Sequence, residues 1–420
     1  MIPTSVSAST QIIVRQAIRS AGPDSRISAP VSSVSVIGSA PPAGSSASDV
    51  PPHAASSEAV SRAAGTRAAR GVGLRMDPPV VNDELEMIII LNSTSRVRPT
   101  AALAVAGLAT GCCLLAALCI GEPMAAPGTA LAALLDPAHP LHVAVADVRL
   151  PRALLGLVAG AGLGVSGLLL QDALRNPVAG PELLGVSSGA AVVVATIVVL
   201  GLAVPLALQP WLALAGALAA GAVVLLTIGR TRDPDHVVLV GAAMSAACGG
   251  LVVAVVGLGT QGNVVVLFRY LLGSLAARGW PHLTTVVPLV LAGIAVAWLL
   301  RRRVEALTLG DEVASGLGVP VTRTRVLAVG VAALLAATVA AACGPVAFVA
   351  LLAPHVARRA LGTTSTRRVL PLVVLTGGLL LALADLAARR LLYPVEVPVG
   401  IATTLVGVPA LLLLRPRARP

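Results

Sequence analysis

Lysine is absent from this chain of 420 residues, aromatic residues make up only 2% of it, and charged residues only 12%. The 30 basic residues are therefore all arginines, and with 19 acidic residues they give a net charge of +11. Hydrophobic residues reach 56%, and the mean hydropathy is +0.90. A soluble protein this apolar could not cover its surface with polar groups, so we predict an integral membrane protein.

Several chemical signatures are also missing. The cysteines lie inside apolar runs without a CxxC pair, so we expect neither a disulfide nor a metal site. No GxxxxGK[ST] phosphate loop occurs, so we do not expect this chain to bind ATP in that way. No Ser/His/Asp or paired-carboxylate arrangement is apparent, and we predict no catalytic residue, no bound cofactor and no enzymatic activity. The arginines lie in short loops between apolar runs, which argues against nucleic-acid binding.

Residues 1–98 differ from the rest in composition. They are rich in Ser, Ala, Pro and Gly and have no sustained apolar period, so we expect a disordered extension. The run Met87–Leu91 is too short to span a bilayer. Translation starting at Met76 or Met87 is an alternative, in which most of this extension would not be made. Residues 99–420 then form the transmembrane domain.

Apolar runs of about twenty residues, the length of one bilayer crossing, follow one another from Thr100 onward. We therefore predict an all-α polytopic membrane protein of about ten transmembrane helices. The pair of segments that flanks Gly344-Pro345 could equally be one broken or re-entrant segment. The predicted spans are 100–120, 153–171, 185–204, 208–229, 237–257, 282–300, 326–343, 346–362, 369–388 and 397–414.

The arginines of this domain are distributed unevenly between the two sets of loops. Most lie in the set that includes Arg301–Arg303 and Arg415–Arg419, which the positive-inside rule places in the cytoplasm together with both ends of the domain. The other set holds only Arg149, Arg152, Arg269, Arg278, Arg389 and Arg390. Glycine recurs at Gly160, Gly162, Gly164 and Gly167, which predicts close packing of the second span against its neighbours.

Three polar features stand out within this apolar background. Arg149 and Arg152 share one helix face, where their guanidinium groups suit either carboxylates of a partner or lipid phosphates. The loop 305–325 is amphipathic, with an apolar stripe of Leu307, Leu309, Val313 and Leu317, and is either a surface helix or a contact for another subunit. His355 is a titratable group in an apolar segment, either a relay or ligand or, as we favour, a structural histidine.

The order of these motifs along the chain resembles the FecCD-type permease subunits of ATP-binding-cassette importers for iron–siderophore complexes and vitamin B12. The resemblance covers about residues 95–415. Ala350 replaces a usual glycine of that family, and Tyr270 a more frequent tryptophan. The matching stretches are RLPR at 149–152, RNPVAGPELLG at 175–185, LGDEVASGLGV at 309–319, GPVAFVALLAPHVAR at 344–358, EVPVG at 396–400 and GVP at 407–409.

The resemblance implies four groups of site residues. An extracytoplasmic solute-binding protein would dock at Arg149, Arg152 and Arg389, and Arg390 could substitute for Arg389. The ATPase coupling loop comprises Leu309, Gly310, Asp311, Glu312, Ala314, Leu317 and Gly318. The translocation path or gate includes Gln171, Asn176, Pro177, Pro234 and Asp235. The structural motif consists of Gly344, Pro345, Pro354, His355, Pro398, Gly400, Gly407 and Pro409.

The resemblance also implies a function. The chain would be the permease of an importer that carries a ferric siderophore across the cell membrane by alternating access. Its partners would be a second copy or a paralogous permease, two ATPase subunits that bind ATP and Mg, and a solute-binding protein. Cobalamin and haem are alternative substrates. An ion-coupled secondary transporter is an alternative of another class, but it needs intramembrane carboxylates, and Asp385 is the only acid clearly within a predicted span.

Overall fold

The structure is a computed structural model that describes residues 98–205, 208–228, 234–259, 267–268, 270–392 and 395–414. The disorder expected for residues up to 97 therefore concerns a part of the chain outside these ranges. Helices make up most of the described ranges, which contain no β-strand beyond an isolated bridge between Leu392 and Val395. The all-helical architecture predicted from the apolar runs is confirmed.

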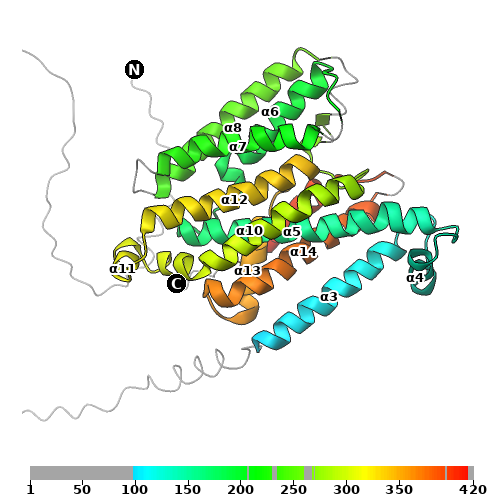
Figure 1. The fold of residues 1–420 in the computed structure, drawn as a ribbon, viewed down its shortest axis with the longest axis horizontal. Helices are drawn as coiled ribbons and strands as arrows, with labels where there is room; N and C mark the ends of the chain where they lie inside the picture. The colour runs from blue at the N-terminus through cyan, green and yellow to red at the C-terminus, as the bar shows by residue number, and fades with distance from the viewer. Residues whose placement is uncertain are drawn as a thin grey trace, which may run out of the picture. The chain divides into compact units, whose positions relative to one another are not determined.

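The helices follow one another with short connections (Figure 1). A π-helical turn, η1, leads directly into α5, and a 3₁₀ turn, η2, precedes α6. The elements are α3 (Pro99–Cys119), α4 (Pro127–Leu135), η1 (Val143–Arg149), α5 (Leu150–Ala173), η2 (Pro181–Leu184), α6 (Val186–Val199), α7 (Gln209–Ile228), α8 (Pro234–Val256), α10 (Trp280–Leu307), α11 (Asp311–Gly316), α12 (Val321–Cys343), α13 (Val349–Leu361), α14 (Thr366–Arg390) and α15 (Val399–Leu414).

Each of the ten predicted spans contains a helix, but not all of these helices are long. Among the described residues, seven helical segments are long and apolar enough to cross a membrane: α3, η1 with α5, α7, α8, α10, α12 and α14. In α6 and α15 the apolar helices are shorter, and α13 has only 13 residues with Pro354 inside it. Breakers accompany these short helices, because Gly201, with a φ of +62°, follows the end of α6, and Gly344-Pro345 separates α12 from α13.

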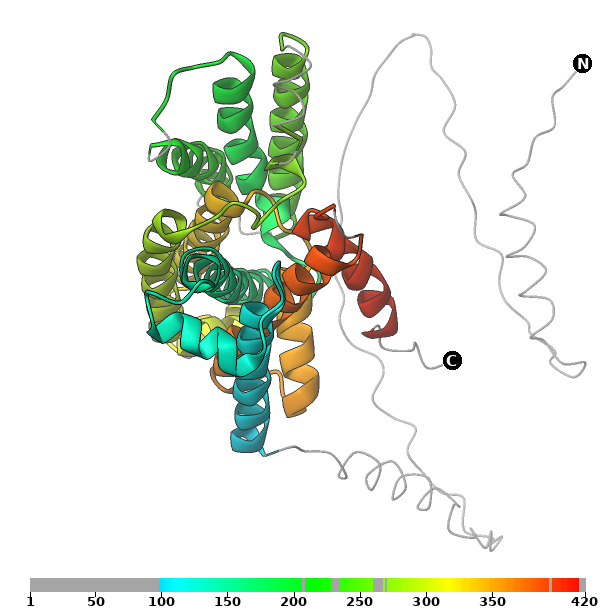
Figure 2. The same ribbon diagram turned by 90° about the vertical axis from the view of Figure 1, so that its right-hand side faces the viewer.

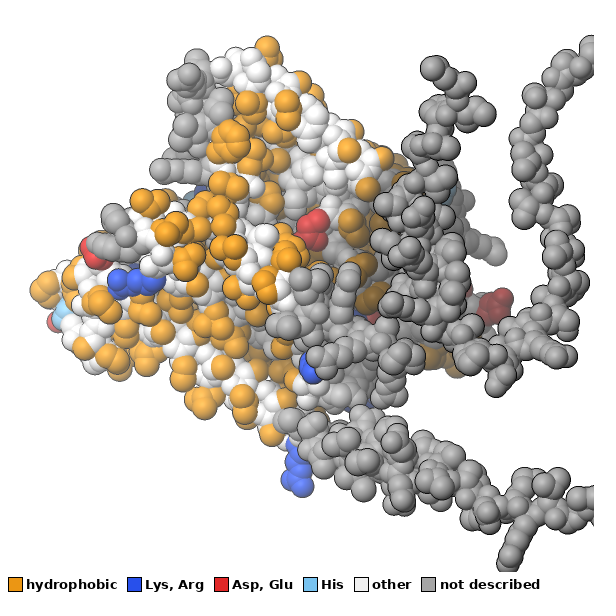
Figure 3. Space-filling model, turned by 180° about the vertical axis from the view of Figure 1, so that it is seen from behind, with side chains coloured by type: hydrophobic (Ala, Val, Ile, Leu, Met, Phe, Trp, Pro, Cys, Tyr) orange, Lys and Arg blue, Asp and Glu red, His pale blue; other side chains and the backbone are white. Residues whose placement is uncertain are grey.

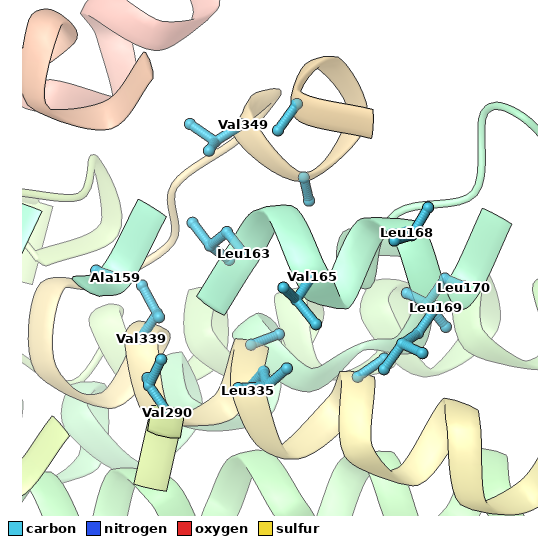
Figure 4. Close-up of a cluster of buried hydrophobic side chains, with 14 of the residues drawn as sticks. Ala159, Leu163, Val165, Leu168, Leu169, Leu170, Val290, Leu335, Val339 and Val349 are labelled. Atoms are coloured by element: carbon cyan, nitrogen blue, oxygen red, sulfur yellow. The ribbon is translucent and has the colours of Figure 1, made fainter. Parts of the chain in front are cut away.

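Helix α5 lies at the centre of the bundle. The helices α10, α12, α13 and α14 pack around it, as the end-on view shows (Figure 2). In an 18-residue apolar window of its spanning segment, 83% of the residues are buried, against 28% for α3 and 17% for α8. Figure 4 shows Leu163, Val165 and Leu168 of α5 among apolar side chains of the neighbouring helices.

The glycines of α5 and α14 allow the backbones to approach closely. A Cβ atom added at Gly160 would collide with the carbonyl oxygen of Gly377, and one at Gly167 with that of Ala350. Gly164 also lies close to a neighbouring backbone, because a Cβ atom added to it would be 3.0 Å from the carbonyl oxygen of Val373. The packing role predicted for this glycine series is confirmed, since small residues hold helices together where lipid provides no hydrophobic force between them.

The outer surface of the helices is largely apolar. Large hydrophobic side chains such as Val105, Leu108 and Leu299 are between 68% and 77% exposed. Figure 3 shows such side chains over much of one face, with few charged groups among them. An exposed apolar surface of this extent on spanning helices is typical of contact with lipid or with other membrane subunits.

Candidate functional site

Polar clusters lie at the two opposite ends of α5. Arg152 is in the first turn of this helix, and Gln171 and Asp172 are in the last. The end near Arg152 is called the Arg152 end below, and the opposite end, which carries α11, the α11 end. Helices α4 and α11 mark these two ends in Figure 1. The buried part of α5 between the clusters is apolar apart from Ser166.

At the Arg152 end, Asp385 of α14 is shared by two arginines. Arg152 donates to Asp385 Oδ1 at 2.9 Å, and Arg389 donates to Asp385 Oδ2. Arg152 also pairs with Glu396 at 3.1 Å. The side chains of Arg152, Arg389 and Asp385 are only 11%, 9% and 5% exposed, whereas that of Glu396 is 48% exposed. Such buried charges are tolerated because each has a bonded partner of opposite sign.

Arg149 has a different environment from Arg152. Its guanidinium donates to the backbone carbonyls of Leu118 at 2.9 Å and Pro123 at 2.6 Å, and the residue is only 5% exposed. Leu118 lies at the end of α3, where carbonyls lack intrahelical partners. A Cβ at Gly121 would lie 2.6 Å from the Nε atom of Arg149, so a larger residue there would displace the guanidinium. Arg149 therefore fixes the connection after α3, and no part of its guanidinium extends freely into solvent.

A cavity of about 340 Å³ opens among these groups. Its charged lining residues are Arg149, Arg152, Arg389, Arg390, Glu122 and Glu396. Arg390 is exposed and forms no ion pair with any carboxylate in the described part of the chain. The arginines exceed the acids around the cavity, which suits a carboxylate-bearing ligand or partner. The structure thus brings the predicted docking residues together, but it buries Arg149 and Arg389 and leaves Arg390 the accessible one.

Helix α11 and the residues that flank it contain the predicted coupling residues. It begins after Gly310, whose φ is +107°, and has Asp311 and Glu312 in its first turn. Asp311 accepts from Arg325 at 2.7 Å and from Arg175 at 3.3 Å. The hydrogen bond from Arg325, more than either nearby charge, lowers the pKa of the Asp311 carboxyl from its ordinary value.

One face of α11 is buried and the other is exposed. Ala314 is fully buried in the core, whereas Leu309, Val313 and Leu317 are 61%, 51% and 63% exposed. Leu307, which we had placed in the same apolar stripe, is instead fully buried, because it still belongs to α10. Gly318 has a φ of +77° and ends the segment. The exposed stripe therefore has three members, next to the charged Glu312, and is open to a partner.

The structure describes the side chains of three predicted path residues, Gln171, Asn176 and Pro177. Gln171 is only 3% exposed, accepts from Arg358 at 2.8 Å and donates to the Leu351 carbonyl at 3.3 Å. Asn176 accepts from the backbone of Val178, which closes the turn that contains Pro177. Pro234 and Asp235 begin α8, but their side chains lie outside the described residues.

Asp172 is a buried polar residue that the sequence analysis missed. It accepts from Arg358 at 2.6 Å and from the Thr366 hydroxyl at 2.7 Å. Helix α5 continues to Ala173, past the predicted span end at residue 171, so Asp172, which is 5% exposed, is a second acid inside a spanning helix beside Asp385. The adjacent Gln171 and Asp172 at the end of an apolar run were the available signal. Glu305 also escaped notice, although it accepts from the Ser365 hydroxyl at 2.7 Å beside the start of α14.

The predicted structural motif surrounds the breaks between α12, α13 and α15. Gly344, with a φ of +77°, approaches the Tyr270 carbonyl, and Gly400 approaches that of Leu272, so neither position has space for a Cβ. Gly407 packs against the Phe348 side chain. Pro345 precedes α13, Pro354 and Pro409 lie inside α13 and α15, and Pro398 directly precedes α15.

His355 hydrogen-bonds within its own helix. Its Nδ1 atom lies 2.8 Å from the Leu351 carbonyl oxygen, one turn earlier in α13. No group of three or more His, Cys, Asp or Glu residues that could hold a metal ion occurs among the described residues. This environment fits the structural histidine that we favoured over a relay or a ligand.

Comparison with known proteins places the chain in a family. The model of the FecCD transport family matches residues 108–417. The Fe(3+) dicitrate transport system permease protein FecD of Escherichia coli is 37% identical over 281 residues, covering 67% of this chain and 87% of that protein. The Fe(3+)-citrate import system permease protein YfmE of Bacillus subtilis is 35% identical over 298 residues, covering 70% and 88%.

A solved structure agrees with these matches. A metal-chelate type ABC transporter in an inward-facing conformation superposes with a TM-score of 0.66 at 27% identity, covering 74% of this chain and 97% of that chain. The fold of this chain is thus similar to that of a solved transporter chain. This chain belongs to the FecCD transport family and is a multi-pass membrane permease.

Proposed function

We propose that this chain is the permease subunit of an ATP-binding-cassette importer and that it carries a ferric siderophore into the cytoplasm. The arrangement of α5 carries the proposal: an arginine-lined cavity lies at one end of this helix, and the exposed stripe of α11 lies at the other. A solute-binding protein with surface carboxylates would dock at the cavity. An ATPase subunit would receive Val313 of α11 and the flanking Leu309 and Leu317 and drive alternating access.

The distribution of arginine supports this orientation. Arg301–Arg303 and Arg367-Arg368 lie at the ends of α10 and α14 that face α11, so the positive-inside rule assigns the α11 end to the cytoplasm. The Arg152 end then faces outward. A second permease, either a copy of this chain or a paralogue, would cover part of the exposed apolar surface and enclose the path. Two ATPase subunits would complete the assembly.

The names of the relatives support an iron chelate as the substrate. Besides the two citrate permeases, the hemin transport system permease protein HmuU of Yersinia pestis is 36% identical over 283 residues. Haem and cobalamin are therefore the alternative substrates. An ion-coupled secondary transporter is less well supported, because the carboxylates of Asp172 and Asp385 are already paired with arginines of this chain.

Uptake by cells tests both the energy source and the substrate. In a host strain that lacks its own copy of the gene, this chain should restore accumulation of a radiolabelled ferric siderophore. Depletion of ATP should abolish that uptake. A protonophore that is added while the ATP concentration is held constant should leave the uptake unchanged. The reverse pattern would identify an ion-coupled carrier. Restored uptake of labelled cobalamin or haemin without ferric siderophore would reassign the substrate.

We expect Arg390→Glu to lower uptake about tenfold at limiting substrate, or roughly 1.4 kcal/mol in docking of the solute-binding protein. Arg390 is exposed at the cavity, so reversing its charge repels an acidic partner without breaking the internal ion pairs. Arg390→Lys keeps the charge and serves as the control, which should retain most of the uptake. Equal uptake by the Glu variant at unchanged membrane level would remove Arg390 from the docking surface.

A further inference from the structure

Arg325 connects three elements at the α11 end. It lies in the second turn of α12, and its side chain is only 4% exposed. Its Nε atom donates to the carbonyl oxygen of Ala173, the last residue of α5, at 3.1 Å. Its Nη2 atom donates to Oδ1 of Asp311, the first residue of α11, at 2.7 Å. One buried guanidinium therefore joins α12, the central helix and α11.

The attachment of α11 to the bundle otherwise rests on few contacts. Ala314 is its only fully buried residue. The second ion-pair partner of Asp311 is Arg175, whose side chain is 40% exposed, so solvent weakens that pair. Gly310 and Gly318 on either side of α11 both have positive φ, a conformation in which other residues are strained. The contact through Arg325 is thus the one buried polar connection between α11 and α5 in the described structure.

The planar guanidinium is suited to this role. It directs two N–H groups at fixed angles toward a helix-end carbonyl that lacks an intrahelical partner and toward a carboxylate. A displacement of Asp311 therefore acts directly on the end of α5. Helix α5 has 24 residues, or about 36 Å of helix, and Arg152 in its first turn bonds Asp385 and Glu396.

We propose that Arg325 is the positioning residue that makes α11 and α5 move as one unit. This inference rests on the proposed function, in which an ATPase subunit contacts α11. Movement of α11 would pass through Asp311 and Arg325 to α5 and so to the ion pairs at the Arg152 end. Arg325 itself contacts neither the transported solute nor the ATPase.

Hydrogen exchange tests the connection in the isolated permease. In lipid nanodiscs, Arg325→Gln should make the amides of residues 309–318 exchange about tenfold faster, because α11 opens locally without its buried tie. The amides of α10 should be unchanged. Arg323→Gln is the matched control, since Arg323 lies two residues away on the same helix but is exposed, and it should behave as the unchanged protein. Arg325→Lys should be intermediate, because an ammonium cannot hold both acceptors in the same geometry.

The assembled transporter tests whether the connection matters for coupling. Transporters assembled from the host's ATPase subunits and the Arg325→Gln permease should hydrolyse ATP at a similar basal rate. They should move several-fold less solute per ATP hydrolysed than transporters with Arg323→Gln. Loss of folded protein alone would lower both quantities and leave this ratio unchanged. If Arg325→Gln fails to fold, Asp311→Ala removes the same acceptor from the more exposed side, at 32% exposure, and should give the same faster exchange of residues 309–318.

Two outcomes would overturn the proposal. One is unchanged exchange of α11 in both variants. The other is faster exchange with an unchanged solute-to-ATP ratio, because α11 would then transmit force without Arg325. The proposed function fails separately, when uptake by the unchanged protein does not depend on ATP.

Discussion

Asp385→Asn should destabilise the protein by about 3–5 kcal/mol, the cost of leaving a buried charge without its partner. Asp385 is the carboxylate that Arg152 and Arg389 share, and all three side chains are nearly buried. After the substitution Arg152 keeps only Glu396, which is 48% exposed. Arg389 keeps only a long contact with the Ala117 carbonyl at 3.5 Å. Thermal unfolding in detergent, followed with a dye that reacts when the buried thiol of Cys343 is uncovered, measures the loss.

Asp147→Asn is the control for this prediction. Asp147 is exposed at the same end of the molecule and forms no ion pair within the described residues, so its unfolding midpoint should match that of the unchanged protein. Equal midpoints for Asp385→Asn and Asp147→Asn would mean that the two arginines find other partners or water. In that event the ion pairs of Asp385 would not hold α5 and α14 together.

Gly167→Ala should also lower the free energy of unfolding, by about 1–3 kcal/mol, because the added methyl group overpacks a contact between two backbones. A Cβ at this position would collide with the carbonyl oxygen of Ala350 in α13. No side chain can rotate to relieve that contact, so α13 has to move away from α5. We expect a lower unfolding midpoint and less protein in the membrane, both measurable in the same detergent assay and by immunoblot.

The same substitution at Gly107 separates packing from helix propensity. A Cβ there would meet no atom within 4 Å. Alanine also favours a helix over glycine by about 1 kcal/mol. Gly107→Ala should therefore be neutral or slightly stabilising. If Gly167→Ala behaved like Gly107→Ala, the close approach of α5 and α13 would not be needed for folding.

Local sequence patterns predicted a large part of this fold. Apolar runs of the right length identified the segments that form helices, and breakers such as Gly344-Pro345 marked where a helix stops. Both signals act within a few residues of one another in the chain, which is why they can be read without a structure. Helix lengths were less accessible, because α6 begins close to the predicted start at residue 185 but ends at Val199, although the apolar run continues to Val204.

The motifs also predicted where the polar groups gather, but not how they pair. The docking group and the coupling loop each lie together in space. The side chain of Arg389 is largely buried and that of its neighbour Arg390 is exposed, because a helix turns by about 100° per residue and gives adjacent residues different surroundings. Which of the two faces the bundle could not be predicted from the sequence. Arg325 and Asp172 were missed for a related reason, since an arginine in a loop and an acid at a span end look like ordinary solvated charges.

Composition and the length of the apolar runs by themselves determined that this protein is a helical membrane protein, since they measure how much apolar surface each segment must bury. Tertiary structure alone decided which charges meet. Arg152 and Asp385 are 233 residues apart in the chain, and Arg325 and Ala173 are 152 apart. Such contacts depend on which helices become neighbours of α5 and in which rotation, and these are fixed by small-residue packing around that helix.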